Sequence, residues 1–245
     1  MAAIAHLSDP HITTGPLGAA PATGLYRALG RVLTLDPRPD CVVITGDLVD
    51  RGTAEEYQVL REVIGDFPLP LHLVAGNHDD PAALLAEFGG GRFLGETTHY
   101  AVEYRGTTLA ILDSATGELG AAQREWLDRT LTDSGPAIVC LHHPPIPVGI
   151  PFTDRQRLAD GEQLADIIRR HDVTRVLTGH VHRPITAAFA GTILTTAPST
   201  HLQSGLALNG GVPDYVPEPT SFLLHLDDAT HTVPVSHAAG TAACY

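Results

Sequence analysis

The chain has 245 residues, of which 43% are hydrophobic and 18% are charged, and this globular composition is long enough for one or two domains with a buried core. Fifteen basic residues against 28 acidic ones give a net charge of −13, and all fifteen are arginines because the chain contains no lysine. The lack of lysine excludes a Walker A loop and Schiff-base chemistry, and the acidic balance argues against binding of a nucleic-acid polymer.

Neither a membrane span nor an export signal is evident in the sequence. No apolar run is long enough to span a bilayer, and the start MAAIAHLSDPH lacks the basic and apolar regions of a secretory signal. The three cysteines, Cys41, Cys140 and Cys244, are too few and too scattered for a disulfide framework. We therefore expect a cytoplasmic protein with reduced thiols and no membrane partner.

The predicted elements alternate between short apolar strands and helices, which is typical of an α/β fold. In chain order, the predicted strands are Ala3–Leu7, Cys41–Thr45, Leu71–Ala75, Tyr100–Tyr104, Thr107–Leu112, Ala137–Leu141, Thr174–Thr178, Ile185–Phe189, Thr192–Thr196, Ser221–Leu226 and Thr232–Val235. The first three, together with Ala137–Leu141 and Thr174–Thr178, are nearly continuous in apolar character, as buried strands of parallel sheets are. The others are antiparallel candidates.

Helices are predicted from their start signals and from their apolar faces. Thr53 and Glu56 have the spacing of a capping box, so one helix begins there. Asp80 directly before Pro81 predicts a second helix, with the aspartate as N-cap and the proline at the first helical position. A third helix is indicated over 164–171, where apolar residues recur on one face.

Two sheets packed face to face, with helices outside, is the most economical arrangement of these elements. No linker divides the chain, so we expect a single domain over residues 1–235 and a loosely ordered tail over 236–245. Long loops in a compact domain are often functional. The long predicted loops are 12–24, 88–98, 143–156 and 197–219.

Five of the strands run directly into a short polar motif. In chain order the motifs are Asp9-Pro10-His11, Gly46-Asp47-Leu48-Val49-Asp50, Gly76-Asn77-His78-Asp79, His142-His143-Pro144-Pro145 and Gly179-His180-Val181-His182. Ligands of open parallel sheets bind beyond the carboxyl ends of the strands, so the motifs converge if the five strands are neighbours in one sheet. Taken singly, each motif is also typical of an ordinary turn. Five in order at strand ends favour a functional site.

The side chains that would converge there are carboxylates, one amide and several imidazoles. These donors suit Mn²⁺, iron or Zn²⁺, and the lack of thiolates argues against a structural zinc site. About seven donors are too many for one ion with open water positions, so two metal ions are indicated, with Asp47 as the natural bridge. Paired ions suit in-line displacement at phosphorus. By contrast, His6, His72 and Cys140 lie within strands and are expected to be core residues.

The ordered motifs D-x-H, G-D-x-x-D, G-N-H-D, H-x-P and G-H-x-H resemble the signature of the calcineurin-like metallophosphoesterases. The resemblance spans residues 9–182 and implies a four-layer αββα sandwich, with two mixed sheets flanked by helices and a dinuclear centre at the strand ends. It implies that two divalent or transition metal ions (Mn²⁺, Fe²⁺/Fe³⁺ or Zn²⁺) are bound. One ion would be held by Asp9, His11, Asp47 and His182, and the other by Asp47, Asn77, His142 and His180.

By the same resemblance, His78 is the catalytic residue that contacts a phosphate oxygen or protonates the leaving alkoxide, oriented by Asp79 or Asp50. In the H-x-P element the first histidine is the ligand of the family, which favours His142 over His143.

The Gly-Asn-His-Asp motif resembles the class III cyclic nucleotide phosphodiesterases and the bacterial glycerophosphodiesterases. Protein phosphatases have an arginine where this chain has Ala75, which argues against that activity. We expect hydrolysis of a small phosphodiester, a 3′,5′-cyclic nucleotide such as cAMP, by a metal-bridging hydroxide. The alternatives are a glycerophosphodiesterase or broad-specificity phosphodiesterase, and a non-catalytic metal-dependent phosphate binder. His201 and Asn209 are candidates for base or sugar contacts, and a homo-oligomer is possible by analogy.

Overall fold

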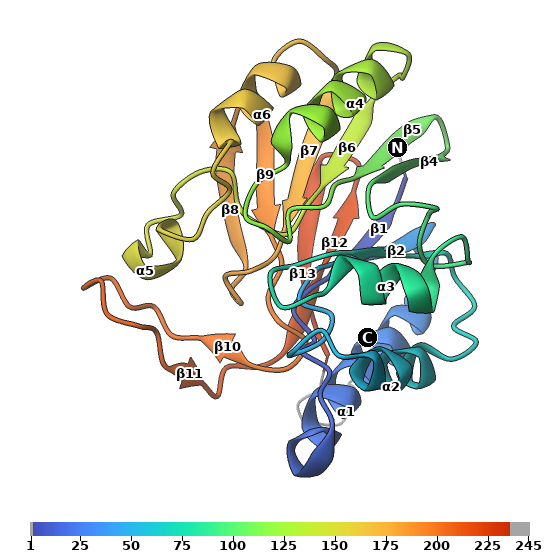
Figure 1. Ribbon diagram of the computed structural model, residues 1–245, viewed down its shortest axis with the longest axis vertical. Helices are drawn as coiled ribbons and strands as arrows, with labels where there is room; N and C mark the ends of the chain where they lie inside the picture. Colours follow the sequence, from blue (N-terminus) through green and yellow to red (C-terminus); the bar gives the residue numbers. More distant parts are fainter. Residues whose placement is uncertain (1, 236–245) are drawn as a thin grey trace, which may run out of the picture.

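The computed structural model describes residues 2–235, which form four layers (Figure 1). The first sheet has the strand order β13-β12-β1-β2-β3, in which β1, β2 and β3 run parallel and β12 and β13 are antiparallel to their neighbours. Its strands are β1 (Ile4–Leu7), β2 (Cys41–Thr45), β3 (Leu71–Val74), β12 (Ser221–Leu226) and β13 (Ala229–Pro234).

The second sheet has the order β4-β5-β6-β7-β9-β8. Strands β5, β6, β7 and β9 are parallel, and β4 and β8 pair antiparallel at the two edges. Its strands are β4 (Tyr100–Tyr104), β5 (Thr107–Ile111), β6 (Ala137–Cys140), β7 (Val173–Thr178), β8 (Ile185–Phe189) and β9 (Thr192–Thr196). Both sheets are therefore mixed, with antiparallel strands at their margins.

Three apolar clusters separate the four layers. The middle cluster fills the space between the sheets, where Ile4 and Val43 of the first sheet meet Ile111 and Leu177 of the second. Outer clusters join the first sheet to α1, α2 and α3, and the second sheet to α4 and α6 (Figure 1). Successive residues of a strand point to opposite faces, so each sheet can supply side chains to two clusters. The predicted αββα sandwich is confirmed.

Helices α2 and α3 begin at the capping signals of the sequence, whereas the N-cap residues of the other four described α-helices make no side-chain capping bond. Thr53 and Glu56 form a complete capping box, and the Asp80 side chain accepts hydrogen bonds from two backbone N–H groups. Helix α1 was not predicted, because Pro21 and Gly24 within it favour a loop. Proline is tolerated there since the first N–H groups of a helix have no intrahelical partner. The helices are α1 (Ala19–Leu33), α2 (Ala54–Ile64), α3 (Pro81–Phe88), α4 (Gly120–Thr132), α5 (Pro151–Asp154) and α6 (Gly161–Ile168).

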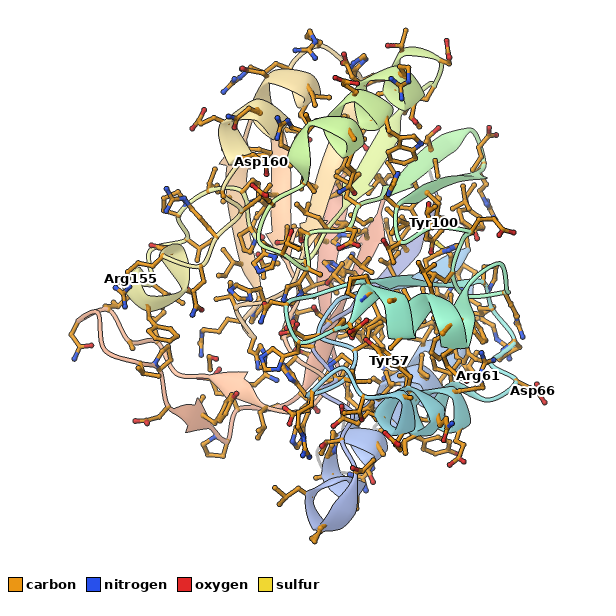
Figure 2. The ribbon with its side chains drawn as sticks, in the orientation of Figure 1. Tyr57, Arg61, Asp66, Tyr100, Arg155 and Asp160 are labelled. Atoms are coloured by element: carbon orange, nitrogen blue, oxygen red, sulfur yellow. The ribbon has the colours of Figure 1, made fainter. Side chains whose placement is uncertain are left out.

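The N-terminus of α4 is capped from a distant part of the chain. The carboxylate of Asp160 (Figure 2) accepts hydrogen bonds from the backbone N–H groups of Leu119 and Gly120, at 3.1 and 3.0 Å, and pairs with Arg124. A carboxylate at this position satisfies otherwise unpaired donors and lies at the positive end of the helix dipole. This contact ties the start of α4 to the start of α6 on the outer face of the second sheet.

The five motif-bearing strands do not lie in one sheet. Strands β1, β2 and β3 belong to the first sheet and β6 and β7 to the second, so the motifs do not converge as neighbours in one sheet. The strand ends still meet, because the backbone N–H of His180, after β7, donates to the carboxylate of Asp9, after β1, at 3.1 Å. Local sequence patterns define strands but not the sheet that each one joins.

A hairpin leaves the sandwich beside these strand ends. It consists of β10 (Gln203–Ser204) and β11 (Tyr215–Val216), and it extends away from the body next to α5 (Figure 1). We call residues 203–216 the arm. None of the described helices is both long and apolar enough to cross a membrane. The tail predicted over 236–245 lies outside the described residues.

Candidate metal centre

Four of the predicted ligands form one compact group. Asp9, His11, Asp47 and His182 each place a donor atom within 4.8 Å of the others. His182 Nε2 lies 3.3 Å from Asp9 Oδ1, and His11 Nε2 lies 3.6 Å from Asp47 Oδ2. The loops after β1, β2 and β7 supply these side chains.

The remaining predicted ligands lie on the other side of Asp47. His142 Nε2 is 3.1 Å from Asn77 Oδ1 and 3.3 Å from Asp47 Oδ1. The ring of His180 contacts that of His142, with 5.1 Å between their centroids. The two oxygens of Asp47 therefore face different groups, since Oδ1 faces His142 and Oδ2 faces His11.

Backbone carbonyls fix the tautomers of two of these histidines. His142 Nδ1 donates to the carbonyl of Thr45 at 2.7 Å, and His182 Nδ1 donates to the carbonyl of Leu202 at 2.8 Å. A carbonyl can only accept, so Nδ1 carries the proton and the Nε2 lone pair is free. Metal-binding histidines commonly have this arrangement, because the outer hydrogen bond orients the ring.

His143 lies close enough to take part but has different hydrogen bonding. Its ring shares a group with His142 and His180 in which the donor atoms lie within 4.8 Å of one another. However, Ser114 Oγ accepts the backbone N–H groups of both His142 and His143 at 3.2 Å, so its own O–H is left to donate to His143 Nδ1 at 3.1 Å. The His143 proton then resides on Nε2, which disfavours metal binding by that nitrogen. This supports His142 over His143, as expected from the sequence.

The backbone of the cluster is strained. Among the described residues, eight other than glycine have positive φ, and five of them are Asp9, His11, Asp47, His180 and His182. Such conformations cost free energy and collect at functional sites, where the surrounding structure enforces them.

Glycines allow the strand ends to approach one another. Gly46 has a φ of +91°, and a Cβ there would lie 2.4 Å from His142 Nδ1. A Cβ on Gly76 would lie 2.3 Å from the backbone nitrogen of Asp47. Any side chain at either position would displace the predicted ligands.

Burial and mutual charge shift the proton equilibria of the cluster. Although burial alone would raise the pKa of Asp47, the imidazoles of His142 and His11 hold it well below its usual range. Burial lowers the pKa of His180 to about 4. Metal binding requires ionised carboxylates and neutral imidazoles, as for Asp47 and His180. Burial would also lower the pKa values of His142 and His182, but the carboxylates of Asp47 and Asp9 raise the pKa of His142 to about 9 and also raise that of His182, so a metal ion must displace a proton from these two rings.

The residues present fit a metal cofactor. The Nε2 atom of His180 is buried and has no hydrogen-bond partner, which is costly for a polar atom unless a ligand satisfies it. It lies in a group with the imidazoles of His142 and His143, and the amide of Asn77 and the carboxylate of Asp47 approach His142 Nε2, so the donors together suit transition metals. The His/Asp cluster is therefore able to bind metal ions.

His78 lies at the mouth of this cluster and is exposed. Its Nδ1 donates to the backbone carbonyl of Asp50 at 2.7 Å, and its backbone N–H donates to Asp47 Oδ1 at 2.9 Å. Of the two residues expected to orient His78, Asp50 contacts its ring, through the backbone carbonyl, and Asp79 does not. The carboxylate of Asp79 instead accepts the backbone N–H of Gly76 at 2.8 Å and the hydroxyl of Tyr57 at 3.0 Å (Figure 2).

The role of Asp79 was missed because most of its partners are backbone N–H groups, which a sequence motif does not reveal. It also accepts the backbone N–H of Leu48 at 3.1 Å, so one buried carboxylate ties the loop after β2 to the loop after β3. Burial, reinforced by the charge of Asp47, raises the pKa of Asp79 to about 7.

A pocket of about 320 Å³ opens over the cluster, and we call it the main pocket. Besides predicted ligands and His78, its walls include Phe152 and Gln156 near α5 and Tyr215 on the arm. The sequence predicted functional loops at 143–156 and 197–219 but did not single out these residues. Of the two candidates for base or sugar contacts, His201 lines a neighbouring pocket, whereas the Asn209 side chain accepts the backbone N–H of Gly211 within the arm.

Comparison with known proteins identifies the family. The family model of the calcineurin-like phosphoesterases matches residues 2–184. The chain therefore belongs to the calcineurin-like phosphoesterases, an enzyme family, and the predicted membership is confirmed.

Its relatives include phosphodiesterases of two kinds. The chain is 31% identical over 238 residues to a probable glycerophosphodiester phosphodiesterase of Arcobacter nitrofigilis, covering 91% of this chain and 87% of that one. It is 32% identical over 226 residues to a cAMP/cGMP dual specificity phosphodiesterase of Mycobacterium tuberculosis, covering 84% and 70%. A dimetal phosphatase from Danio rerio has the same fold, with a TM-score of 0.67 at 15% identity over 96% of this chain and 99% of that one.

Proposed function

We propose that the protein is a dinuclear metal-dependent phosphodiesterase. One ion would be held by Asp9, His11, Asp47 and His182, and the second by Asp47, Asn77, His142 and His180. The observation that carries this proposal is the orientation of Asp47, whose two carboxylate oxygens face His142 and His11 at 3.3 and 3.6 Å. A carboxylate placed in this way can bridge two ions.

The bound ions would supply positive charge that activates water and neutralises the phosphoryl oxygens of the substrate. The chain itself supplies a proton donor for the leaving alkoxide. His78 holds one proton on Nδ1 through the carbonyl of Asp50, so in its protonated form Nε2 donates the second proton into the main pocket. A linear diester would give a phosphomonoester and an alcohol, whereas a 3′,5′-cyclic nucleotide would give one phosphomonoester with a free sugar hydroxyl.

The proposed substrate is a small phosphodiester, with a 3′,5′-cyclic nucleotide such as cAMP as the leading candidate. The Mycobacterium tuberculosis relative acts on cyclic nucleotides, and an aromatic ring, Phe152, and an amide, Gln156, line the main pocket. A planar base can stack on such a ring and bond to such an amide. Glycerophosphodiesters are the second candidate, because the name of the Arcobacter relative gives that activity. The match with that relative also covers a larger share of this chain, 91% against 84%.

The test is turnover by protein loaded with Mn²⁺, Fe²⁺ or Zn²⁺. The substrates are 3′,5′-cAMP, glycerophosphoethanolamine and bis(p-nitrophenyl) phosphate, compared by kcat/KM, with metal content measured on the same samples. We expect about two ions per chain in the active protein. Turnover of no diester, together with tight phosphate binding, would refute the enzyme and favour a binding protein.

A homo-oligomer and a cytoplasmic location stay predictions. The arm carries exposed apolar side chains, including Leu206, Leu208 and Val212, which could pair with another copy of the chain. Light scattering of the purified protein, compared with a variant in which these three residues are serine, tests the first prediction.

A further inference from the structure

A second pocket opens onto the same cluster from the other side of Tyr215. It has a volume of about 210 Å³, and we call it the side pocket. The two pockets share four wall residues, which are His11, His78, His182 and Tyr215. Both cavities therefore reach the candidate catalytic histidine.

Tyr215 stands between the two pockets. It belongs to β11 of the arm, where it pairs with Ser204 of β10, and its ring lies over His182 with 6.0 Å between the centroids. The backbone N–H of Ser204 donates to the carbonyl of His182, so the base of the arm is held against the cluster. The ring of Tyr215, although 61% exposed, thus lines both pockets where the arm meets the cluster.

The compartments differ in chemistry. The main pocket alone contains Asp47, Asn77 and His180, so it holds the phosphate together with one ester group. The side pocket combines apolar walls, formed by Leu17, Pro21 and Leu202, with polar walls, formed by Thr13, Asp50 and His201.

The charge of the walls limits what the side pocket can hold. Asp50 is its one acidic wall residue, and none of the described residues that line either pocket is an arginine. The Asp50 carboxylate would repel a group with negative charge, whereas the imidazoles that line the pocket can donate hydrogen bonds to an ester or hydroxyl oxygen.

We propose that the side pocket binds the second alcohol group of an acyclic phosphodiester, while the main pocket binds the first. This inference rests on the proposed phosphodiesterase function and extends its substrate class. A linear diester carries its two ester oxygens on separate groups, which need separate space on either side of the phosphorus. In a 3′,5′-cyclic nucleotide both ester oxygens belong to one sugar, so the side pocket would stay free.

The test compares two diesters that release the same leaving group. Bis(p-nitrophenyl) phosphate has two aryl ester groups, whereas methyl p-nitrophenyl phosphate has one aryl and one methyl ester group. Leu17→Trp fills the side pocket, and Val212→Trp fills the main pocket; these side chains are 79% and 71% exposed, so neither change disturbs the core. Leu208→Trp is the matched control, since Leu208 is 63% exposed and lines neither pocket.

Both pocket-filling variants should lower kcat/KM for the bis-aryl ester at least tenfold, within the range of about 10–200-fold that fit of an apolar group supplies. For the methyl ester, one of the two variants should lower kcat/KM to the same extent, and the other should change it less than threefold. The variant that leaves turnover of the methyl ester nearly unchanged identifies the pocket that binds the non-leaving group.

The inference is overturned if Leu17→Trp leaves bis-aryl kcat/KM within threefold of wild type, if both fillers affect the two esters equally, or if Leu208→Trp causes the same loss. Metal content must equal that of the wild type in every variant compared. Failure of the proposed function is a separate result, because then metal-loaded wild-type protein would turn over neither ester.

Discussion

Replacement of His78 by alanine tests the proton donor most directly. The ring is exposed and makes one hydrogen bond, from Nδ1 to the carbonyl of Asp50. Losing that bond should cost stability only about 1 kcal/mol. The backbone N–H that donates to Asp47 Oδ1 stays in the variant, so metal content should not change.

The expected loss of activity depends on the leaving group. Removal of one donor to a developing charge costs about 10²–10³ in rate, or about 3–4 kcal/mol of transition-state stabilisation. A sugar or glycerol alkoxide needs a proton to depart, whereas p-nitrophenolate does not. We therefore expect His78→Ala to lower kcat by about 10²–10³ for the faster of 3′,5′-cAMP and glycerophosphoethanolamine. For bis(p-nitrophenyl) phosphate the loss should be at least tenfold smaller.

The assay is steady-state kinetics on metal-loaded protein, with metal content and thermal unfolding measured in parallel. His171→Ala is the matched control, because His171 bonds to Asp128 away from the cluster and the variant should keep full activity. Equal losses for the two kinds of leaving group would refute proton donation and leave only charge stabilisation. Full activity of His78→Ala would refute any catalytic role.

Three further substitutions test the bridging role of Asp47, the close packing of Gly46 against His142 and the titration of the buried His6. Asp47→Asn should lower the content of both metal ions, measured by elemental analysis, and loss of one ion alone would contradict a bridging role. Gly46→Ala should lose metal and activity, because its Cβ would collide with His142. Gly106→Ala is the control, since Gly106 also has a positive φ but has open space around it. This variant should keep its metal and lose only about 1 kcal/mol of unfolding free energy, measured with urea. Normal metal content in Gly46→Ala would contradict the packing argument. Burial lowers the pKa of His6 to about 3, so below pH 6.5 the unfolded chain binds a proton that the folded chain does not. The free energy of unfolding is therefore unaffected by His6 above pH 6.5 and falls by about 1.4 kcal/mol for each pH unit below it. Between pH 7 and pH 5 the wild type should therefore lose about 2 kcal/mol more in urea unfolding than His6→Gln, and equal losses would show that His6 titrates normally.

The sequence was most informative where a structure depends on neighbouring residues. Strand β2 and helix α2 match their predicted limits closely, because a continuous apolar run and a capping box are local signals. His72 was correctly expected to be a hydrogen-bonded core residue, since its ring nitrogens contact the hydroxyls of Tyr100 and Tyr104 at 3.3 and 2.7 Å.

The failures concern relations between distant segments. Membership of β6 and β7 in a second sheet depends on the packing of whole layers, which a strand pattern does not encode. Asp79 was assigned to the wrong partner because adjacency in sequence suggested His78, while the fold turns the carboxylate towards backbone donors and Tyr57. The pocket walls formed by Phe152 and Tyr215 come from two loops that meet only in the folded protein.

The left-handed backbone at five of the candidate ligands has a consequence for metal exchange. Hydrogen bonds within the chain help to fix those conformations, since the backbone N–H groups of Asp9 and His11 donate to the carbonyls of Gly46 and Asp47, so the spacing of the donors depends on the fold. Ions of similar radius would bind at the same donor spacing. Replacing one ion with another should therefore change kcat far more than the order of the substrates by kcat/KM. Which of manganese, iron and zinc is bound would then depend on the concentration of each metal around the protein rather than on the geometry of the site.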